Sequence, residues 1–134
     1  MKRTSLWSLQ QALYERLMSD NLLNKKITGV FDEVIEGTPY PYVTIGEPTV
    51  LPFETKTSFG EEVAIVLHCW SQYPGKKEAF EILNLILGAI TKSPLVITGG
   101  FSLLKTELEQ MTVIIDIDDV TRHGIIRLKF YINN

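Results

Sequence analysis

The stretch Val63-Ala64-Ile65-Val66-Leu67-His68-Cys69-Trp70 decides how this chain folds. Both alternating sets of its residues are apolar until His68, which is the pattern of a strand buried on both sides. We therefore expect this strand at the centre of a sheet. The turn signal Tyr73-Pro74-Gly75 comes next, and it predicts the start of a helix.

Two amphipathic helices are predicted, one on each side of this strand in the sequence. The apolar positions of the first helix are Leu6, Leu9, Leu13 and Leu17, with Trp7, Tyr14 and Met18 in a second stripe beside them. Those of the second helix are Ala79, Ile82, Leu83, Ile86 and Ile90. Thr4 or Ser5 is expected to supply the oxygen that caps the first helix. Leu85 falls outside the stripe of the second helix, so either further packing or a partner must cover it.

Shorter patterns predict the remaining elements. Alternating or β-branched residues predict strands in residues 27–35, 42–45, 101–108, 111–117 and 126–132. Residues 47–61 contain two prolines and a Thr-Lys-Thr-Ser stretch, and we interpret them as a long loop. Loops of this length usually carry function.

The order of these elements predicts an α+β fold, because the strands cluster late in the chain and do not alternate with helices. We expect a mainly antiparallel sheet of about four or five strands, with two amphipathic helices packed on one face. Residues 1–134 are interpreted as a single domain with a long loop at 47–61.

Composition excludes several classes of protein. The net charge of −3 argues against a protein that coats nucleic acid, because phosphate neutralisation supplies most of that affinity. The one cysteine, Cys69, cannot form a disulfide within the chain. Gln10 and Gln11 interrupt any secretory signal, and the apolar run 82–90 is too short to cross a membrane. We expect a protein with no membrane association.

Two groups of residues carry side chains that are able to bind a metal ion or act in catalysis. Asp116, Asp118 and Asp119 have the oxygen ligands that a hard cation prefers, although their surroundings do not match an EF-hand loop. His68 points away from Cys69 on a strand, so only His123 is a candidate base for that thiol. The favoured interpretation of both clusters is structural, and we predict no catalytic residue, no cofactor and no metal.

Four segments in order resemble the tail completion proteins of long, non-contractile-tailed bacteriophages, of the type found in Bacillus siphophages. They are Val30-Phe31-Asp32-Glu33-Val34, Thr38-Pro39-Tyr40-Pro41-Tyr42-Val43-Thr44-Ile45-Gly46, Leu67-His68-Cys69-Trp70-Ser71 followed by Gly75-Lys76-Lys77-Glu78-Ala79, and Val120-Thr121-Arg122-His123-Gly124-Ile125-Ile126-Arg127-Leu128. The resemblance covers nearly the whole chain. It implies a fold similar to the tail terminator of phage lambda, a mixed sheet with helices packed against it.

The resemblance also implies a structural, non-enzymatic role. Similar proteins cap the finished tail tube as a ring, usually a hexamer, and dock it onto the head connector. The expected partners are therefore further copies of this chain, a head connector or stopper protein and the tail tube protein, with DNA passing through but not specifically bound. The expected location is the head–tail interface of the virion, with the host cytoplasm during assembly. The free chain is expected to be a monomer.

Residues of the predicted long loop 47–61 and of the polar connection before the last strand are the candidates for these protein contacts. They are Pro48, Pro52, Phe53, Thr55, Lys56, Thr57, Phe59, Asp118, Asp119, Arg122 and His123. Two alternatives from other classes remain: a small metal-dependent enzyme that uses the three aspartates, and a module that binds a peptide or small ligand through its aromatic loops.

Overall fold

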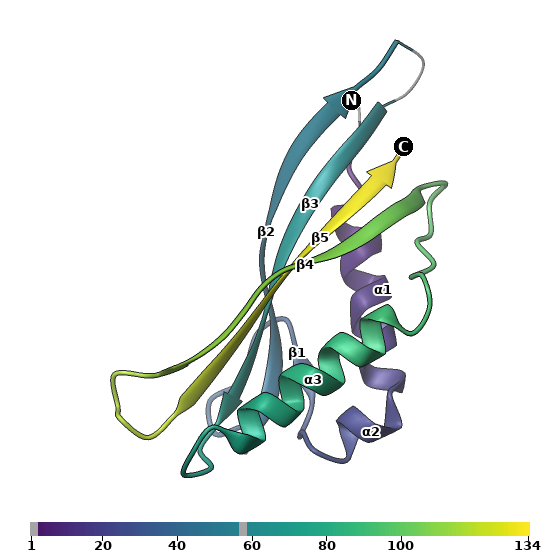
Figure 1. Cartoon of the computed structure of the whole chain (residues 1–134). Coiled ribbons are helices and arrows are strands. Elements are labelled where there is room, and N and C mark those ends of the chain that lie inside the picture. The colour runs from purple at the N-terminus through teal and green to yellow at the C-terminus, as the bar shows by residue number, and fades with distance from the viewer. Residues whose placement is uncertain (1–2, 57–58) are drawn as a thin grey trace.

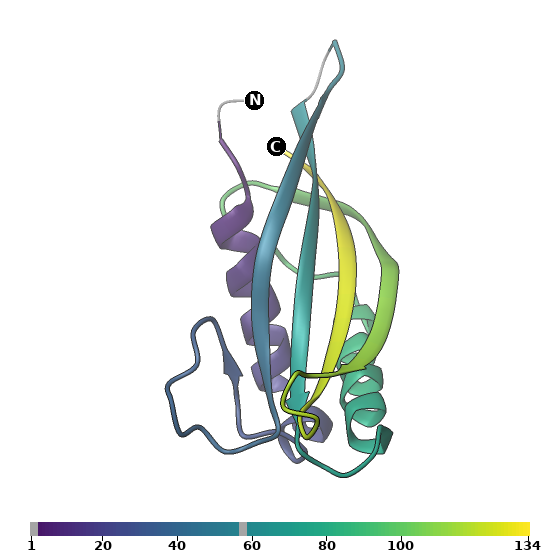
Figure 2. The ribbon, with the colours of Figure 1, turned by 90° about the vertical axis from the view of Figure 1, so that its left-hand side faces the viewer.

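The computed structural model describes residues 3–56 and 59–134, and it contains a five-stranded sheet with its long helices on one face (Figures 1 and 2). The helices are α1 (Leu6–Ser19), α2 (Asn21–Asn24) and α3 (Lys77–Thr91). The strands are β1 (Val30–Phe31), β2 (Tyr42–Glu54), β3 (Phe59–Ser71), β4 (Ser102–Ile115) and β5 (Arg122–Asn133). The predicted α+β fold with a mainly antiparallel sheet is confirmed.

Strand β3 holds the centre of the sheet, as the sequence predicts. The strand order is β1-β2-β3-β5-β4, and every pairing is antiparallel except that of β1 with β2. The prediction that β3 is buried on both sides is wrong for the face that no helix covers. On that face Val66, His68 and Trp70 are only partly buried.

The hydrophobic core lies between the sheet and the helices. Alternate residues of β3 and β5 point into it, and α1 and α3 contribute the stripes expected from their sequences. The fully buried side chains include Leu9, Leu13, Leu17, Leu67, Ile82, Ile86, Ile126, Leu128, Phe130 and Ile132. Each such side chain contributes about 1.5–3 kcal/mol relative to an exposed one, so this single layer accounts for most of the apolar stabilisation.

Residues 47–61 do not form the predicted long loop. β2 continues to Glu54 and β3 begins at Phe59, so most of this segment is a long hairpin (Figure 1). The two prolines caused the error, because proline usually interrupts a strand. Pro48 stands where the β2–β3 register shifts at a bulge, and Pro52 lies beyond the short stretch of β2 that β1 covers. Bulges and edge strands are the places where a sheet accepts proline.

Three other predicted boundaries also need correction. The strands expected at 101–108 and 111–117 are one strand, β4, whose register shifts at two irregular points. Of the strand expected at 27–35, only Val30 and Phe31 pair with β2. A short third helix, α2, follows α1, which ends close to Asp20 as predicted.

The N-terminus of α1 is held by an acidic side chain from β3, not by its own cap. Ser5 occupies the cap position, but its hydroxyl makes no capping bond. Instead the Ser5 hydroxyl donates to the carboxylate of the fully buried Glu61, which also accepts the Ser5 N–H at 2.6 Å and the Thr4 hydroxyl at 2.9 Å. A carboxylate at this position also favours the helix dipole. The start of α1 is thereby fixed to the centre of the sheet.

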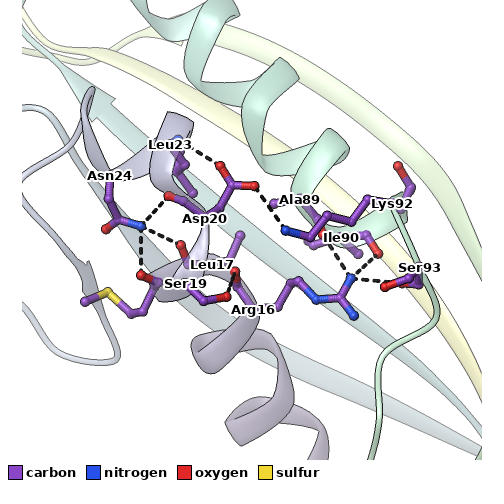
Figure 3. Close-up of polar contacts among 12 residues, drawn as sticks. Arg16, Leu17, Ser19, Asp20, Leu23, Asn24, Ala89, Ile90, Lys92 and Ser93 are labelled. Carbon is purple, nitrogen blue, oxygen red and sulfur yellow. Dashed lines mark hydrogen bonds and ion pairs between the residues drawn. The ribbon is translucent and has the colours of Figure 1, made fainter.

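The other end of the helical layer is joined by Arg16 (Figure 3). Its guanidinium reaches from α1 to the C-terminus of α3, where the last carbonyls of a helix have no partner within the helix. It donates to the carbonyl oxygens of Ala89 at 3.0 Å, Ser93 at 2.9 Å and Pro94 at 3.2 Å. One cation therefore caps α3 and fixes the position of α1 beside it.

We expect Arg16→Met to lower the free energy of unfolding by about 2 kcal/mol, because it keeps the aliphatic stem and removes hydrogen bonds from a charged donor. Lys92→Met is the matched control, since the Lys92 ammonium is half-exposed and pairs with Asp20 at 3.6 Å. Its loss should cost about 0.5 kcal/mol or less. Urea denaturation of both variants measures the difference, and equal losses would contradict the role given to Arg16.

Candidate interaction surfaces

Apart from Pro48, which lies at the bulge of β2 opposite Ile65, the predicted contact residues fall into two groups at opposite ends of the sheet. The first group lies where β2 meets β3, and the second lies in and after the β4–β5 turn (Figure 1). β3 and β5 pair along their whole lengths, from Gly60 with Asn133 to Ser71 with Arg122. At about 3.3 Å per residue this separates the groups by roughly 40 Å. They do not form one site.

The end of the β2–β3 hairpin presents apolar side chains to solvent. Leu51, Phe53 and Phe59 are all exposed there. The Phe53 ring lies over Gly60 of the neighbouring strand, where an added Cβ would come within 2.3 Å of a ring carbon. Gly60 therefore leaves room for this ring. Thr55 and Lys56 follow β2, whereas Thr57 lies outside the described residues.

The β4–β5 turn is held rigidly by Asp118. Its carboxylate accepts hydrogen bonds from the backbone N–H groups of Val120 at 2.9 Å and Thr121 at 2.8 Å, and from the Thr121 hydroxyl at 2.7 Å. These bonds lower the pKa of Asp118. Asp119 adopts a positive φ of 57°, which a non-glycine residue rarely does. The turn holds Ile117 fully exposed.

The three aspartates do not form a metal site. Within residues 3–56 and 59–134, no group of three or more acidic, histidine or cysteine side chains is placed to hold a metal ion. Asp118 is engaged with its own turn, and Asp116 accepts the backbone N–H of Ile117. These carboxylates stabilise the turn, so the geometry does not support the alternative of a metal-dependent enzyme built on this cluster.

Cys69 and His123 do not form a nucleophilic pair. Cys69 is opposite Gly124 in the register, so its side chain points into the core, whereas His123 points to the face that no helix covers. Burial raises the pKa of the Cys69 thiol to about 12. The thiol therefore stays protonated at neutral pH and packs as a small apolar group.

His123 instead belongs to a cluster of stacked rings on the open face of the sheet. Its Nε2 lies 2.6 Å from Nδ1 of His68, and its ring stacks on Trp70 with centroids 3.9 Å apart. The Trp70 indole N–H donates to the Thr44 hydroxyl at 3.1 Å. The sequence analysis named His68 and His123 separately but missed the cluster, because β3 and β5 are distant in sequence.

Both imidazoles are held in the neutral form. Burial lowers the pKa of His68, with partial opposition from the Glu47 carboxylate. Burial and the neighbouring His68 lower the pKa of His123, with partial opposition from Asp116. A single hydrogen bond between two neutral rings needs one donor and one acceptor, which two protonated rings do not supply.

Charged side chains cover the remainder of the open face, and they form ion pairs across the strands. Lys129 lies 2.8 Å from Glu62 and 3.4 Å from Glu109, and Arg127 also pairs with Glu109. Lys105 on β4 pairs with Glu107. Since these cations are already matched by carboxylates, this face presents no excess of positive charge to a phosphate backbone.

A groove of about 520 Å³ lies between α1 and the short strand β1. Trp7, Tyr14 and Phe31 line its aromatic part, and Glu15, Asp32 and Glu33 add acidic groups. The sequence analysis predicted Trp7 and Tyr14 as part of a wide apolar helix face. The structure leaves Trp7 66% exposed and Tyr14 44% exposed, so this stripe faces outward.

The fold and these surfaces define a class of protein: a small α+β subunit with exposed apolar surfaces suited to contact with other proteins. No helix in the described part of the chain has the length and apolar character needed to cross a membrane.

The chain belongs to the tail completion protein gp17 family, whose model matches residues 11–133. It is 40% identical over 127 residues to the tail completion protein gp17 of Bacillus phage SPP1, covering 95% of this chain and 93% of that protein. The structure of bacteriophage SPP1 gp17 superimposes with a TM-score of 0.62 over 93% of this chain and 90% of that one. A chain from the virion of a native gene transfer agent particle has the same fold, with a TM-score of 0.86, 21% identity and coverage of 94% and 95%. The resemblance found in the sequence is confirmed.

The neutral His68–His123 pair makes stability depend on pH. Because both pKa values are lowered in the folded chain, the unfolded chain binds protons first as the pH falls below about 6.5. We expect the free energy of unfolding to be highest above pH 6.5 and to decrease as the pH falls through the folded pKa values. Urea denaturation between pH 7.5 and pH 5 measures this decrease.

The double variant His68→Asn, His123→Asn is the control, because asparagine does not titrate in this range. Its free energy of unfolding should change less between pH 7.5 and pH 5 than that of the unaltered chain. Identical pH profiles would show that the pair does not bind protons differently in the two states.

Proposed function

We propose that this chain is a structural protein of a phage virion that closes the end of the tail tube and joins the tail to the head connector. The single observation that carries this proposal is the family match over residues 11–133 together with 40% identity to a tail completion protein over nearly the whole chain. The printed role of that relative, tail completion, is transferred to this chain on that basis.

The shape of the subunit supports a joint between two other bodies. Its exposed apolar groups lie at both ends of a long sheet, around Phe59 at one end and around Ile117 at the other. A protein that connects a head to a tail needs two such ends. We infer that one end contacts the head connector or stopper and the other contacts the tail tube.

We infer a ring of copies, most simply a hexamer, with a monomer as the free form. Heterologous contacts that close by rotation produce rings. The net charge of −3 per chain, with the cations of the open sheet face already paired, suits a ring through which DNA passes without specific binding. Assembly in the host cytoplasm before incorporation at the head–tail interface completes the proposal.

A nonsense mutation in the gene for this chain should produce filled heads and separate tails in the lysate. Plasmid-borne wild-type protein should restore joined particles. Electron microscopy counts the filled heads, the separate tails and the joined particles. Normal joined virions without this chain would overturn the proposed function.

The β2–β3 hairpin end is expected to be one of the contact surfaces, through Pro52, Phe53, Thr55, Lys56, Thr57 and Phe59. Phe59→Ser removes an apolar side chain that is exposed in the isolated subunit, so its melting temperature should stay within a few degrees of wild type. Loss of a central apolar contact typically costs about 2 kcal/mol or more of binding energy. In the complementation assay, Phe59→Ser should therefore leave heads and tails unjoined.

Val96→Ser is the control, because Val96 is even more exposed than Phe59 but lies in the segment between α3 and β4. It should support normal joining. If both variants join heads to tails equally well, the hairpin end is not a contact surface.

A further inference from the structure

The helical layer does not cover the whole sheet. The register with β5 shows which β4 residues face the helices. Leu108 is opposite Leu128, and Met111 is opposite Ile126, so both point to the helical side of the sheet. The β5 residues are fully buried, whereas Leu108 is 46% exposed and Met111 is 38% exposed. The difference arises because α3 packs mainly against β3 and β5 and contacts β4 less.

The uncovered strip continues to the end of β4. Val113 is half-buried and Ile115 is 50% exposed on the same side. Leu108, Met111, Val113 and Ile115 are here called the β4 strip. Side chains in this position would normally pack under a helix, so the strip lacks a covering element.

Arg122 lies at the end of the β4 strip, and its charge helps to lower the pKa of the nearby Asp118. Arg122 is opposite both Ile115 and the buried Ser71, so its side chain lies on the same side as the strip. Its Nε is buried without a hydrogen-bond partner, and the guanidinium donates only to the carbonyl of Val120. Arg122 makes no ion pair with a carboxylate in residues 3–56 and 59–134. A buried, unsatisfied donor on a charged group requires an explanation.

The opposite edge of the sheet carries exposed apolar side chains and negative charge. There Trp7 and Tyr14 project from α1 beside the groove, and Met18, which is 41% exposed, continues the stripe. Glu15, Asp32 and Glu33 line the same groove and make no ion pair within the described part of the chain. This surface, here called the α1 face, therefore combines an unpacked apolar helix stripe with unpaired negative charge.

We propose that the α1 face of one copy packs on the β4 strip of a second copy, with Arg122 reaching the carboxylates of Glu15, Asp32 or Glu33. α1 of the first copy then lies over β4 of the second copy, where its own helices give little cover. The orphaned guanidinium gains a carboxylate acceptor, which is the geometry that arginine favours. This inference rests on the proposed function, since it supplies the contact between neighbouring subunits of the ring.

A second copy fits both surfaces for two reasons. The charges are complementary, since the guanidinium of Arg122, whose Nε is buried without a hydrogen bond, adjoins the β4 strip and three carboxylates adjoin the α1 face. The surfaces also lie at opposite edges of the sheet, α1 beyond β2 and β4 on the other side (Figure 2). A single chain therefore does not bring its own two surfaces together, whereas neighbouring copies match each surface with the other.

Disulfide cross-linking tests the contact directly. Tyr14→Cys and Met111→Cys place thiols on the two surfaces, and the two variant chains are co-expressed in cells infected with the nonsense mutant. The native Cys69 is buried and its pKa is about 12, so it does not compete. Oxidised particles are expected to contain a dimer of one variant chain with the other, and particles with either variant alone should contain none.

Val96→Cys paired with Tyr14→Cys is the matched control, because Val96 is exposed but outside the β4 strip. It should give no cross-linked dimer. If joined particles contain both variant chains and the Tyr14–Met111 pair gives no more dimer than the control, the proposed contact is overturned while the proposed function stands. If the nonsense mutant makes normal particles, the proposed function fails, and the cross-link is then measured on the concentrated purified chains.

A charge exchange tests the role of Arg122. Arg122→Glu and Glu15→Arg should each reduce the yield of joined particles by about a hundredfold, because breaking one desolvated charge pair at an interface costs about 2–5 kcal/mol. Combining the two substitutions in one chain should restore much of that yield. Melting temperatures near that of wild type show that each variant folds, and Arg122→Gln replaces Arg122→Glu if the latter does not. Normal yield from a folded Arg122 variant would overturn its role as the anchor.

Discussion

The structure depends on how much of the sheet its helices are able to cover, because two long helices must shield one face of five strands. Neighbouring strands lie about 4.8 Å apart, so five of them are about 19 Å wide between the outer strand axes, and twist adds to that width. A helix with its side chains is about 10 Å across. α1 lies on the β1 and β2 side of the sheet (Figure 2), and α3 packs mainly against β3 and β5, with fewer contacts to β4. The exposure of Leu108, Met111 and Ile115 on β4 follows from this shortfall.

The face of the sheet that no helix covers is shielded from water in a different way. It carries no helix, and much of it is polar, although Ile114 is 47% exposed there opposite His123. Near the β4–β5 turn it is closed by the stacked rings of Trp70, His68 and His123, and toward the hairpin end by ion pairs such as Lys129 with Glu62. Polar groups that satisfy one another make this face stable in water. The apolar excess is therefore concentrated on the helical side and at the two ends.

The sequence predicts correctly the helices and strands that are determined by their own residue pattern. It fails for features that depend on residues distant in the sequence. The apolar run Val63 to Trp70 and the helical stripes identify β3, α1 and α3 correctly, because burial imposes its period directly on the residue pattern. Pro48 and Pro52 make β2 resemble a loop, since a sequence does not reveal that they stand at a bulge and on an unpaired edge. Likewise, Ser5 matches the pattern of a helix cap, but its partner is Glu61, 56 residues away. The residue types at the turn and hairpin ends are predictable, whereas the β4 strip is not, because its exposure depends on where α3 ends its coverage.

The placement of the two unmatched surfaces restricts the assemblies that this chain is able to form. In a two-fold dimer, a patch on one copy contacts either the same patch on the other copy or a second patch, and the axis then repeats that contact with the copies exchanged. The α1 face and the β4 strip lie at opposite edges of the sheet, so their pairing in one dimer would leave a second α1 face and a second β4 strip uncovered. In an open chain of copies, one α1 face and one β4 strip stay uncovered at the two ends, however many copies are added. Under the proposed contact between the α1 face and the β4 strip, only a rotation that closes on itself matches every α1 face with a β4 strip, so that proposal favours a closed ring over a dimer.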